Sequence, residues 1–470
     1  MFAEFLNRDV VLHHLDLLKK SVVTERGTKS SAGQPTADED ALLTELNQAE
    51  AKERVATTGQ ASFEPPTDRR VWKEAPPLDD YVFISKDPVI SLLQSALDEC
   101  AECEAYNDGS RAAAPPVGRL GDELPLVTDE SLGRSLQSTR ARDRRLFEKF
   151  SITDIGWVRS KVAEGIRLLR GKHEFNSRPA KVATMPDRVR LVLVGDWGTG
   201  LPRAQAVAAQ MRIKIDEALA QGVSVHVIHL GDVYYSGWGR EYKKRFLPYW
   251  PVRAGEAQRV GSWCLNANHD MYSGGYGYFG DALGDPRFAA WQNDGHKPTS
   301  FFSLVNAHWK ILGLDTGWDN AGLKDPQNQW LEDELRSAGG RKTLLLSHHQ
   351  LFSAFDEVAS TLVKKVTPIL SRNPVTAWFW GHEHRCMSFA AHANVKFGRC
   401  VGDGGVPVYQ WHKESDPYPP PGLYEHRRFI LNGLERWAYM GFAVLDLTND
   451  KIEAKYVDDK GIEHRRETIS

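Results

Sequence analysis

The feature that most constrains the fold of this chain is a set of short polar blocks, each of which follows an apolar run. The runs are rich in β-branched residues and are typical of buried strands. They span residues 189–194, 224–230, 343–346 and 375–380. A helical pattern at residues 203–220 separates the first two runs. Strand, polar turn, helix and strand in this order predict a βαβ unit, and ligands of such sheets collect at the carboxyl ends of the strands.

The polar blocks carry side chains that bind metal ions. They are Gly195-Asp196-Trp197-Gly198, Gly231-Asp232-Val233-Tyr234-Tyr235, Asn268-His269-Asp270, Ser347-His348-His349 and Gly381-His382-Glu383-His384. Carboxylate, imidazole and phenolate groups suit iron, manganese and zinc better than calcium. Two cations roughly 3.5–4 Å apart need a shared anionic ligand, and a carboxylate bridges well. The inventory therefore predicts a hydrolytic site with two metal ions.

The bulk composition is that of a globular protein without an obvious polyanionic partner. The chain has 470 residues and a formal net charge of −3, so it offers no global basic field to nucleic acid or to an anionic membrane. No apolar run approaches the roughly 20 residues that span a bilayer. The first residues lack the unbroken apolar segment of a signal peptide. Five cysteines are an odd and sparse set, so we expect no disulfide framework and a reducing, cytoplasmic location.

The chain divides near Pro186, where the character of the sequence changes. Before it, we expect a short amphipathic helix in residues 1–22, a polar and loosely ordered stretch at 24–80, a helix at 87–104 and one or two helices within 129–171. After it, we expect a hairpin from 301–305 and 309–315 and two closing strands at 439–447 and 452–456. The prediction is a helical and partly disordered N-terminal region of unknown role, residues 1–175, and a catalytic domain, residues 186–470. All the polar blocks lie after residue 194, so a fragment that begins near residue 176 should retain the chemistry.

The order and type of the blocks resemble the calcineurin-like metallophosphoesterase superfamily over about residues 186–470, and are nearest to its purple acid phosphatase-like branch. The usual first block of the superfamily is Asp-x-His, but Gly198 stands at the position of the histidine. Tyr235 lies three residues after Asp232, as does the tyrosinate that replaces this histidine in the purple acid phosphatase pattern. Ala267 departs from the glycine that the family usually has before Asn-His.

The resemblance implies a role for each residue of the site. The first ion would be held by Asp196, Asp232, Tyr235 and His384, and the second by Asp232, Asn268, His348 and His382, with Asp232 bridging. His269 would protonate the leaving alkoxide or steer the phosphate. Two metal ions per chain, iron with zinc or manganese, are implied as cofactors. Two alternatives stay open, because Tyr234 competes with Tyr235 for the tyrosine position and His349, interpreted as a structural histidine, neighbours His348.

The resemblance also implies the fold and the activity. The fold would be α/β, a four-layer β-sandwich flanked by helices and preceded by a mainly helical N-terminal region. The reaction would be hydrolysis of a phosphate monoester or diester with metal-bound hydroxide as nucleophile. The alternatives are a phosphodiesterase for cyclic nucleotides or nucleic acid, and a scaffold with a partner-binding N-terminal region. We expect a small phosphorylated substrate and neither a membrane nor nucleic acid, and a protein partner could bind through residues 1–175.

Overall fold

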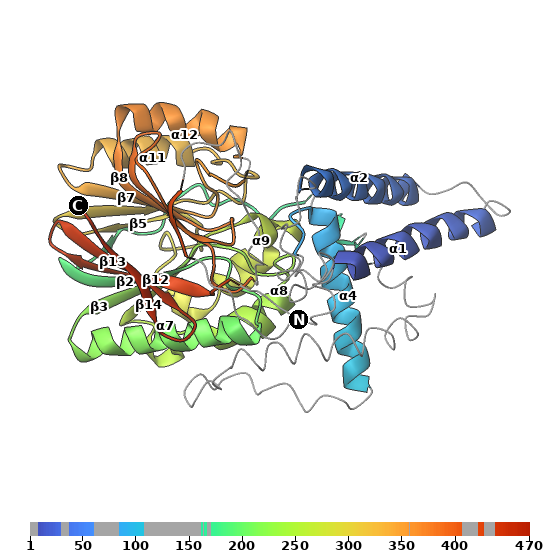
Figure 1. The fold of residues 1–470 in the computed structure, drawn as a ribbon, viewed down its shortest axis with the longest axis horizontal. Helices are drawn as coiled ribbons and strands as arrows, with labels where there is room; N and C mark the ends of the chain where they lie inside the picture. Colours follow the sequence, from blue (N-terminus) through green and yellow to red (C-terminus); the bar gives the residue numbers. More distant parts are fainter. Residues whose placement is uncertain are drawn as a thin grey trace, which may run out of the picture.

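Two β-sheets that face each other form the centre of the molecule. The computed structural model of the protein describes residues 8–29, 37–60, 84–107, 161–162, 164–166, 171–356, 358–406, 422–426 and 438–470. Within these residues one sheet has six strands and the other has eight. Helices lie on both outer faces, and a separate group of helices lies at one end of the sandwich (Figure 1).

The six-stranded sheet contains the predicted βαβ unit, in the order β14-β13-β12-β2-β3-β4. Its strands are β2 (Arg188–Val194), β3 (Ser224–His229), β4 (Val260–Cys264), β12 (Gly441–Thr448), β13 (Lys451–Asp458) and β14 (Glu463–Ile469). The strands β2, β3 and β4 are parallel, and α7 (Pro202–Ala220) connects β2 to β3. The other three strands form an antiparallel meander that joins β2 through β12. The predicted strands and helix of this unit are therefore present.

The eight-stranded sheet has the order β1-β5-β6-β7-β8-β10-β9-β11. Its strands are β1 (Ala183–Thr184), β5 (Phe302–Val305), β6 (Trp309–Gly313), β7 (Lys342–Ser347), β8 (Val375–Trp380), β9 (Cys386–Phe389), β10 (Val395–Val401) and β11 (Gly422–Glu425). The strands β5 and β6 form the predicted hairpin, and β6, β7, β8 and β10 run parallel. The run before each histidine block is thus a central strand.

The buried residues alternate along the central strands, as a sheet covered on both faces requires. In β2, Leu191 and Leu193 belong to the cluster between the two sheets, together with Leu344 of β7. Val192 and Val194 belong instead to the cluster that β2 and β3 share with α7. The helices α11 (Gln327–Arg336) and α12 (Ser360–Arg372) cover the outer face of the other sheet. The result is the predicted four-layer sandwich of helices, sheet, sheet and helices.

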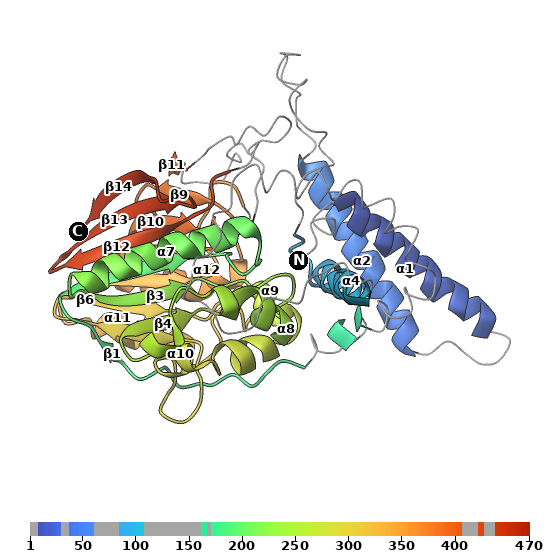
Figure 2. The same cartoon turned by 90° about the horizontal axis from the view of Figure 1, so that it is seen from below.

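Three N-terminal helices pack on one another beside the sandwich (Figure 2). They are α1 (Arg8–Lys29), α2 (Ala37–Gln60) and α4 (Pro88–Asn107). The prediction of a loosely ordered stretch at 24–80 is wrong for residues 37–60, because Leu42, Leu46 and Ala49 recur at helical spacing and are buried. The helices predicted within 129–171 lie mostly outside the described residues.

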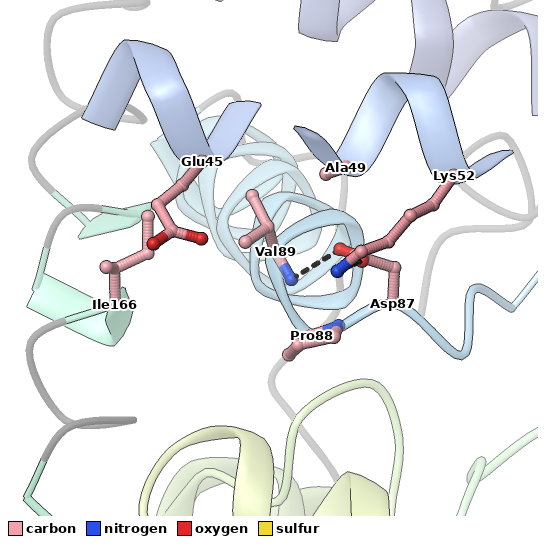
Figure 3. A pocket seen from close by; sticks show the side chains of 7 residues that line it. All are labelled: Glu45, Ala49, Lys52, Asp87, Pro88, Val89 and Ile166. Atoms are coloured by element: carbon pink, nitrogen blue, oxygen red, sulfur yellow. Dashed lines mark hydrogen bonds and ion pairs between the residues drawn. The ribbon is translucent and has the colours of Figure 1, made fainter. Parts of the chain in front are cut away.

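The helices α2 and α4 enclose a small pocket (Figure 3). It is lined by Glu45, Ala49, Lys52, Asp87, Pro88, Val89 and Ile166. Lys52 of α2 approaches Asp87 to 3.4 Å, and Asp87 caps α4 by accepting the N–H of Val89 at 2.9 Å. The pocket contains none of the predicted metal ligands, so it is separate from the predicted chemistry.

Two short helices, α8 (Gly239–Glu241) and α9 (Asn268–Tyr272), lie on the side of the sandwich towards α4, whereas α10 (Pro286–Ala289) packs against β4. The helix α9 packs against α4, and α8 lies next to α9 in Figure 2. Among the described helices, none is long and apolar enough to cross a membrane.

Candidate metal centre

The predicted ligands lie where parallel strands end. Asp196 follows β2, Asp232 follows β3 and Asn268 begins α9 after β4. On the facing sheet, His348 follows β7 and His382 follows β8. Because parallel neighbours end at the same edge, the two sheets together bring these side chains to one end of the sandwich.

Four of the predicted ligands have a left-handed backbone conformation. The φ angles are 56° at Asp196, 77° at Asp232, 69° at His382 and 53° at His384. Residues with a Cβ rarely adopt this conformation, which costs on the order of 1 kcal/mol or more at each position. The chain turns sharply out of each strand here, and a Cβ on Gly381 would lie 2.6 Å from Asp196 Oδ2. The tight turns press the backbone of one block against the side chain of another.

A tyrosine hydroxyl stands at the centre of the first group of ligands. The Tyr234 hydroxyl lies 2.8 Å from Asp196 Oδ1, 3.0 Å from Asp232 Oδ2 and 3.0 Å from His384 Nε2. His384 Nε2 also lies 3.4 Å from Asp196 Oδ1. These four side chains converge on one point, as a metal-binding group would.

Tyr235, the tyrosine predicted as a ligand, is not brought to this point. Its backbone N–H donates to Glu241 Oε1 at 2.7 Å, and the Arg245 guanidinium lies 5.6 Å from the centre of its ring. The ring belongs to the cluster that contains the N-terminal helices. The structure thus brings the hydroxyl of Tyr234 to the acidic and histidine side chains, while Glu241 and the apolar contacts hold Tyr235 on the side of the helices.

The second group of ligands surrounds His348. Its Nε2 lies 2.9 Å from Asn268 Oδ1, 3.1 Å from His382 Nδ1 and 3.4 Å from Asp232 Oδ2. Its Nδ1 faces the backbone oxygen of Leu230 at 3.0 Å, which fixes the orientation of the ring. Asp232 thus lies between the two groups, with Oδ2 close to both Tyr234 and His348.

His349, for which the sequence predicts a structural role, lies beside this second group. Its ring centre is 4.7 Å from that of His382, and its Nδ1 lies 2.9 Å from the Thr316 hydroxyl. Donor atoms of His348, His349 and His382 lie within 4.8 Å of one another. The contact with Thr316 agrees with a structural role, while the distance keeps a ligand role open.

His269 faces the centre with one ring nitrogen. Its Nδ1 lies 2.5 Å from the backbone oxygen of Tyr235, so that nitrogen carries the proton in the neutral ring. Its Nε2 lies 3.9 Å from Asp232 Oδ2 and has no hydrogen-bond partner among the described residues. Burial lowers the pKa of His269 to about 3. The neutral ring therefore presents an unprotonated nitrogen to the centre.

Asp270 supports the second block rather than His269. Its carboxylate accepts the backbone N–H groups of Asp232 and Val233 at 3.2 and 3.1 Å, and the Tyr242 hydroxyl at 2.5 Å. These bonds fix the turn that carries Asp232. Ala267, which stands where the resemblance predicts glycine, has φ −137° and needs no left-handed conformation.

The electrostatics of the centre fit bound cations. Burial, reinforced by the charges of Asp196 and Asp270, raises the pKa of Asp232 well above its usual range. Burial also lowers the pKa of His348 and His382 well below the usual value, which leaves neutral imidazoles with lone pairs to donate. The single proton of the Tyr234 hydroxyl cannot satisfy two carboxylates and an imidazole. A buried excess of acceptors of this kind suits bound cations.

Lys86 of the N-terminal region lies near the entrance of the centre, although no sequence motif indicates this position. The Tyr272 hydroxyl accepts from Asn268 Nδ2 at 2.7 Å and donates to the backbone oxygen of Lys86. Lys86 Nζ forms a 3.0 Å ion pair with Asp356, and the lysine side chain is 44% exposed. Its charge is among the causes that lower the pKa of His269. The segment before α4 is therefore part of the rim of the site.

Comparison with known proteins finds phosphoesterases that are similar to this chain. A family model described as calcineurin-like phosphoesterase matches residues 189–386, which include all five ligand blocks. Tartrate-resistant acid phosphatase type 5 from Oryctolagus cuniculus is 26% identical over 308 residues, which cover 58% of this chain and 88% of that protein. The Homo sapiens protein of the same name is 24% identical over 309 residues, with the same coverage of 58% and 88%.

Among solved structures, the purple acid phosphatase from yellow lupin (Lupinus luteus) seeds has a TM-score of 0.44 and 15% sequence identity. The match covers 62% of this chain and 55% of that chain. Residues 189–386 therefore match the calcineurin-like phosphoesterase family, and the similarity to the acid phosphatases supports the resemblance to its purple acid phosphatase-like branch.

Proposed function

We propose that this phosphoesterase hydrolyses a small phosphate monoester or diester at a centre of two metal ions. The observation that carries the proposal is the position of Asp232, whose Oδ2 lies 3.0 Å from the Tyr234 hydroxyl and 3.4 Å from His348 Nε2. A carboxylate between two donor groups is what a pair of cations requires. Asp196, Asp232, Tyr234 and His384 would hold one ion, and Asp232, Asn268, His348 and His382 the other.

The donor chemistry supports iron at the first position with zinc or manganese at the second. A phenolate is a hard anionic oxygen, whereas the second group is dominated by imidazole, which suits zinc. When bound, the two ions would neutralise charge on the phosphoryl oxygens and make a water molecule more acidic. The residues of this chain would orient the ester and move its protons.

His269 is proposed to contact the phosphoryl group or the leaving oxygen. Its Nδ1 is engaged by the backbone oxygen of Tyr235, so Nε2 is the nitrogen that can face the substrate. A bound anion would favour the protonated ring, which could then donate a proton to the leaving alkoxide. The same nitrogen could instead steer the phosphate without transferring a proton.

Lys86 is proposed to attract and orient the anionic substrate. Neighbouring residues hold its backbone, because Ser85 N–H donates to Gln94 Oε1 at 3.1 Å and Asp87 caps α4. The side chain remains 44% exposed, so a ligand can approach it. A fixed backbone with an accessible ammonium group is suited to recognition of a phosphate at the rim.

We also propose that the protein is cytoplasmic. Cys264, Cys386 and Cys400 are buried and form no disulfide in the described part of the chain. Free thiols persist in reducing compartments, which supports a cytoplasmic location.

Metal analysis combined with a substrate panel tests the proposed function. The purified full chain should bind two ions in the centre, and chelation should abolish hydrolysis of nitrophenyl monoesters or diesters. Restoring the metals should restore turnover. A protein that holds two ions in this centre but hydrolyses no ester of the panel would contradict the proposal and favour the scaffold alternative.

A further inference from the structure

A second cluster of donor atoms lies outside the proposed centre. Cys386, Asp403 and His426 place a sulfur, a carboxylate oxygen and a ring nitrogen within 4.8 Å of one another. All three side chains are buried, with residue exposures of 4%, 5% and 5%. None of them has a role in the proposed phosphoesterase centre.

The backbone of the eight-stranded sheet brings these residues together. Cys386 begins β9 and pairs with Val401 at the end of β10, two residues before Asp403. His426 follows β11, and its N–H donates to the backbone oxygen of Cys386 at 2.9 Å. The cluster therefore joins three consecutive neighbours in the sheet at the edge from which His382 and His384 project.

The polar atoms of the cluster lack partners. Within the described residues, neither Asp403 Oδ1 nor His426 Nε2 has a hydrogen bond, although both atoms are fully buried. His426 Nδ1 lies 3.9 Å from Asp403 Oδ2. A buried carboxylate without a hydrogen bond on one oxygen is costly unless a cation compensates it.

The guanidinium groups nearby already face other carboxylates. Arg203 Nε lies 2.6 Å from Asp459, Arg385 pairs with Glu425, and Arg465 lies 3.6 Å from Glu467. Among the described lysines, arginines and histidines, His426 alone lies within 4.0 Å of the Asp403 carboxylate. Within the described residues, Asp403 therefore forms no salt bridge with a lysine or an arginine.

We infer that Cys386, Asp403 and His426 form a structural site for a single zinc ion, distinct from the phosphoesterase centre. A thiolate, an imidazole and a carboxylate are the donors that zinc takes in tetrahedral sites, whereas calcium and magnesium take oxygen ligands. The fourth position would go to water or to a backbone oxygen. Zinc–ligand distances are roughly 2.0–2.3 Å, so the three donors would close in by small side-chain rotations.

The protonation states of the cluster support this inference. Burial raises the pKa of Asp403 to about 7. Burial lowers the pKa of His426 to about 3. The protein environment alone thus favours neutral groups, and a cation would stabilise the carboxylate and the thiolate while the thiol proton passes to solvent.

The zinc ion would stabilise the two turns that lie next to the proposed phosphoesterase ligands. Cys386 lies two residues after His384. Gly402, which precedes Asp403, lies so close to Asp196 that a Cβ on it would be 2.8 Å from Asp196 Oδ2. Zinc bound to Cys386 and Asp403 would therefore hold two turns against the first ligand group.

Cobalt substitution of the full chain tests the site. Protein stripped with a chelator and titrated with Co²⁺ should develop a thiolate-to-cobalt charge-transfer band in the near ultraviolet. The ligands proposed for the phosphoesterase centre contain no sulfur, so that centre cannot give this band. Cys386→Ser should abolish the band, whereas the control variants Cys264→Ser and Cys400→Ser, and the double variant of Cys100 and Cys103, should retain it.

Two further measurements keep the result decisive. Asp403→Asn, which preserves shape, should weaken Co²⁺ binding at the band and lower the zinc content by one ion per chain. Asp232→Asn should retain the band even if it loses turnover, which separates this site from the phosphoesterase centre. A wild-type protein without the band, or a band that survives in Cys386→Ser, would overturn the inference.

Discussion

Lys86 and Asp356 are 270 residues apart in the sequence, yet their charged groups form an ion pair of 3.0 Å at the rim of the metal centre. The pair links the segment before α4 to the loop between β7 and α12. A region that the sequence marks as separate from the catalytic domain thus contributes a cation to its entrance. The first prediction follows from this contact.

Lys86→Gln should lower kcat/KM for phosphate monoesters by about 10-fold and weaken inhibition by inorganic phosphate. A hydrogen bond to a charged group contributes about 1.5–3 kcal/mol, and the partial exposure of Lys86 reduces that value. Steady-state kinetics and phosphate inhibition constants measure the effect. Lys52→Gln is the matched control, because Lys52 pairs with Asp87 in the pocket of Figure 3. Equal effects of the two variants would show that only the net charge matters.

Tyr234→Phe should remove the visible colour of iron-loaded, oxidised protein, and Tyr235→Phe should leave it. A phenolate bound to ferric iron gives a charge-transfer band in the visible range, and the Tyr234 hydroxyl is the one that meets Asp196, Asp232 and His384. Visible spectroscopy with elemental analysis of iron measures both variants. Loss of colour in Tyr235→Phe alone would restore the register predicted from the sequence.

Asp232→Asn should lose nearly all turnover together with metal from both positions. The carboxylate lies between the two ligand groups, and an amide cannot supply the bridging negative charge. Metal content per chain and hydrolysis of an activated ester are the measurements. A variant with two ions in the centre and the wild-type rate would remove Asp232 from the bridging position.

His269→Ala should keep the metals but lower kcat by roughly 10²–10⁴-fold, the usual contribution of a general acid. If His269 donates a proton, the loss should shrink for substrates with good leaving groups such as nitrophenol. If it positions the phosphate instead, the loss should be the same for all leaving groups. Rates measured across a series of leaving groups distinguish the two roles, and unchanged rates on every substrate would exclude both.

A fragment that begins near residue 176 should be less stable than the full chain and should hydrolyse esters poorly. The expectation that this fragment retains the chemistry does not agree with the packing, because Tyr234, Tyr235 and Leu201 share a buried cluster with the N-terminal helices. Ser95 also donates to Glu241 at 3.0 Å across the same boundary. Thermal denaturation and ester hydrolysis of both proteins test this point. A fragment with the melting temperature and activity of the full chain would show that the contacts are dispensable.

The sequence predicts the sandwich well where strands are apolar and central. The runs before Asp196, Asp232, His348 and His382 are buried on both faces, so their composition alone indicates strands. The edge strand β14 was not predicted, because Glu463–Ile469 is mostly charged and its side chains form ion pairs such as that of Arg466 with Glu463. Charged residues are common on edges, where they oppose aggregation.

In the candidate site, too, the sequence predicts features that depend on neighbouring residues and misses those that depend on tertiary packing. The residue types and order of the ligand blocks are local, and the structure brings Asp196, Asp232, Asn268, His348, His382 and His384 to one end of the sandwich. The choice between Tyr234 and Tyr235 depends on Glu241 and on helices far away in the sequence, so spacing alone could not decide it. The position of Lys86 depends wholly on tertiary packing, and no local pattern could reveal it.

Asp196, Asp232, His382 and His384 adopt a left-handed backbone conformation. The strain of these four residues lowers the thermal stability of the protein. Glycine adopts that conformation with the least steric penalty. Selection for stability alone would therefore favour glycine at these four positions, and each such replacement would delete a proposed ligand. A descendant of this chain that no longer needed its reaction would be free to exchange the metal centre for a higher melting temperature, whereas a catalytic lineage must keep the strained turns.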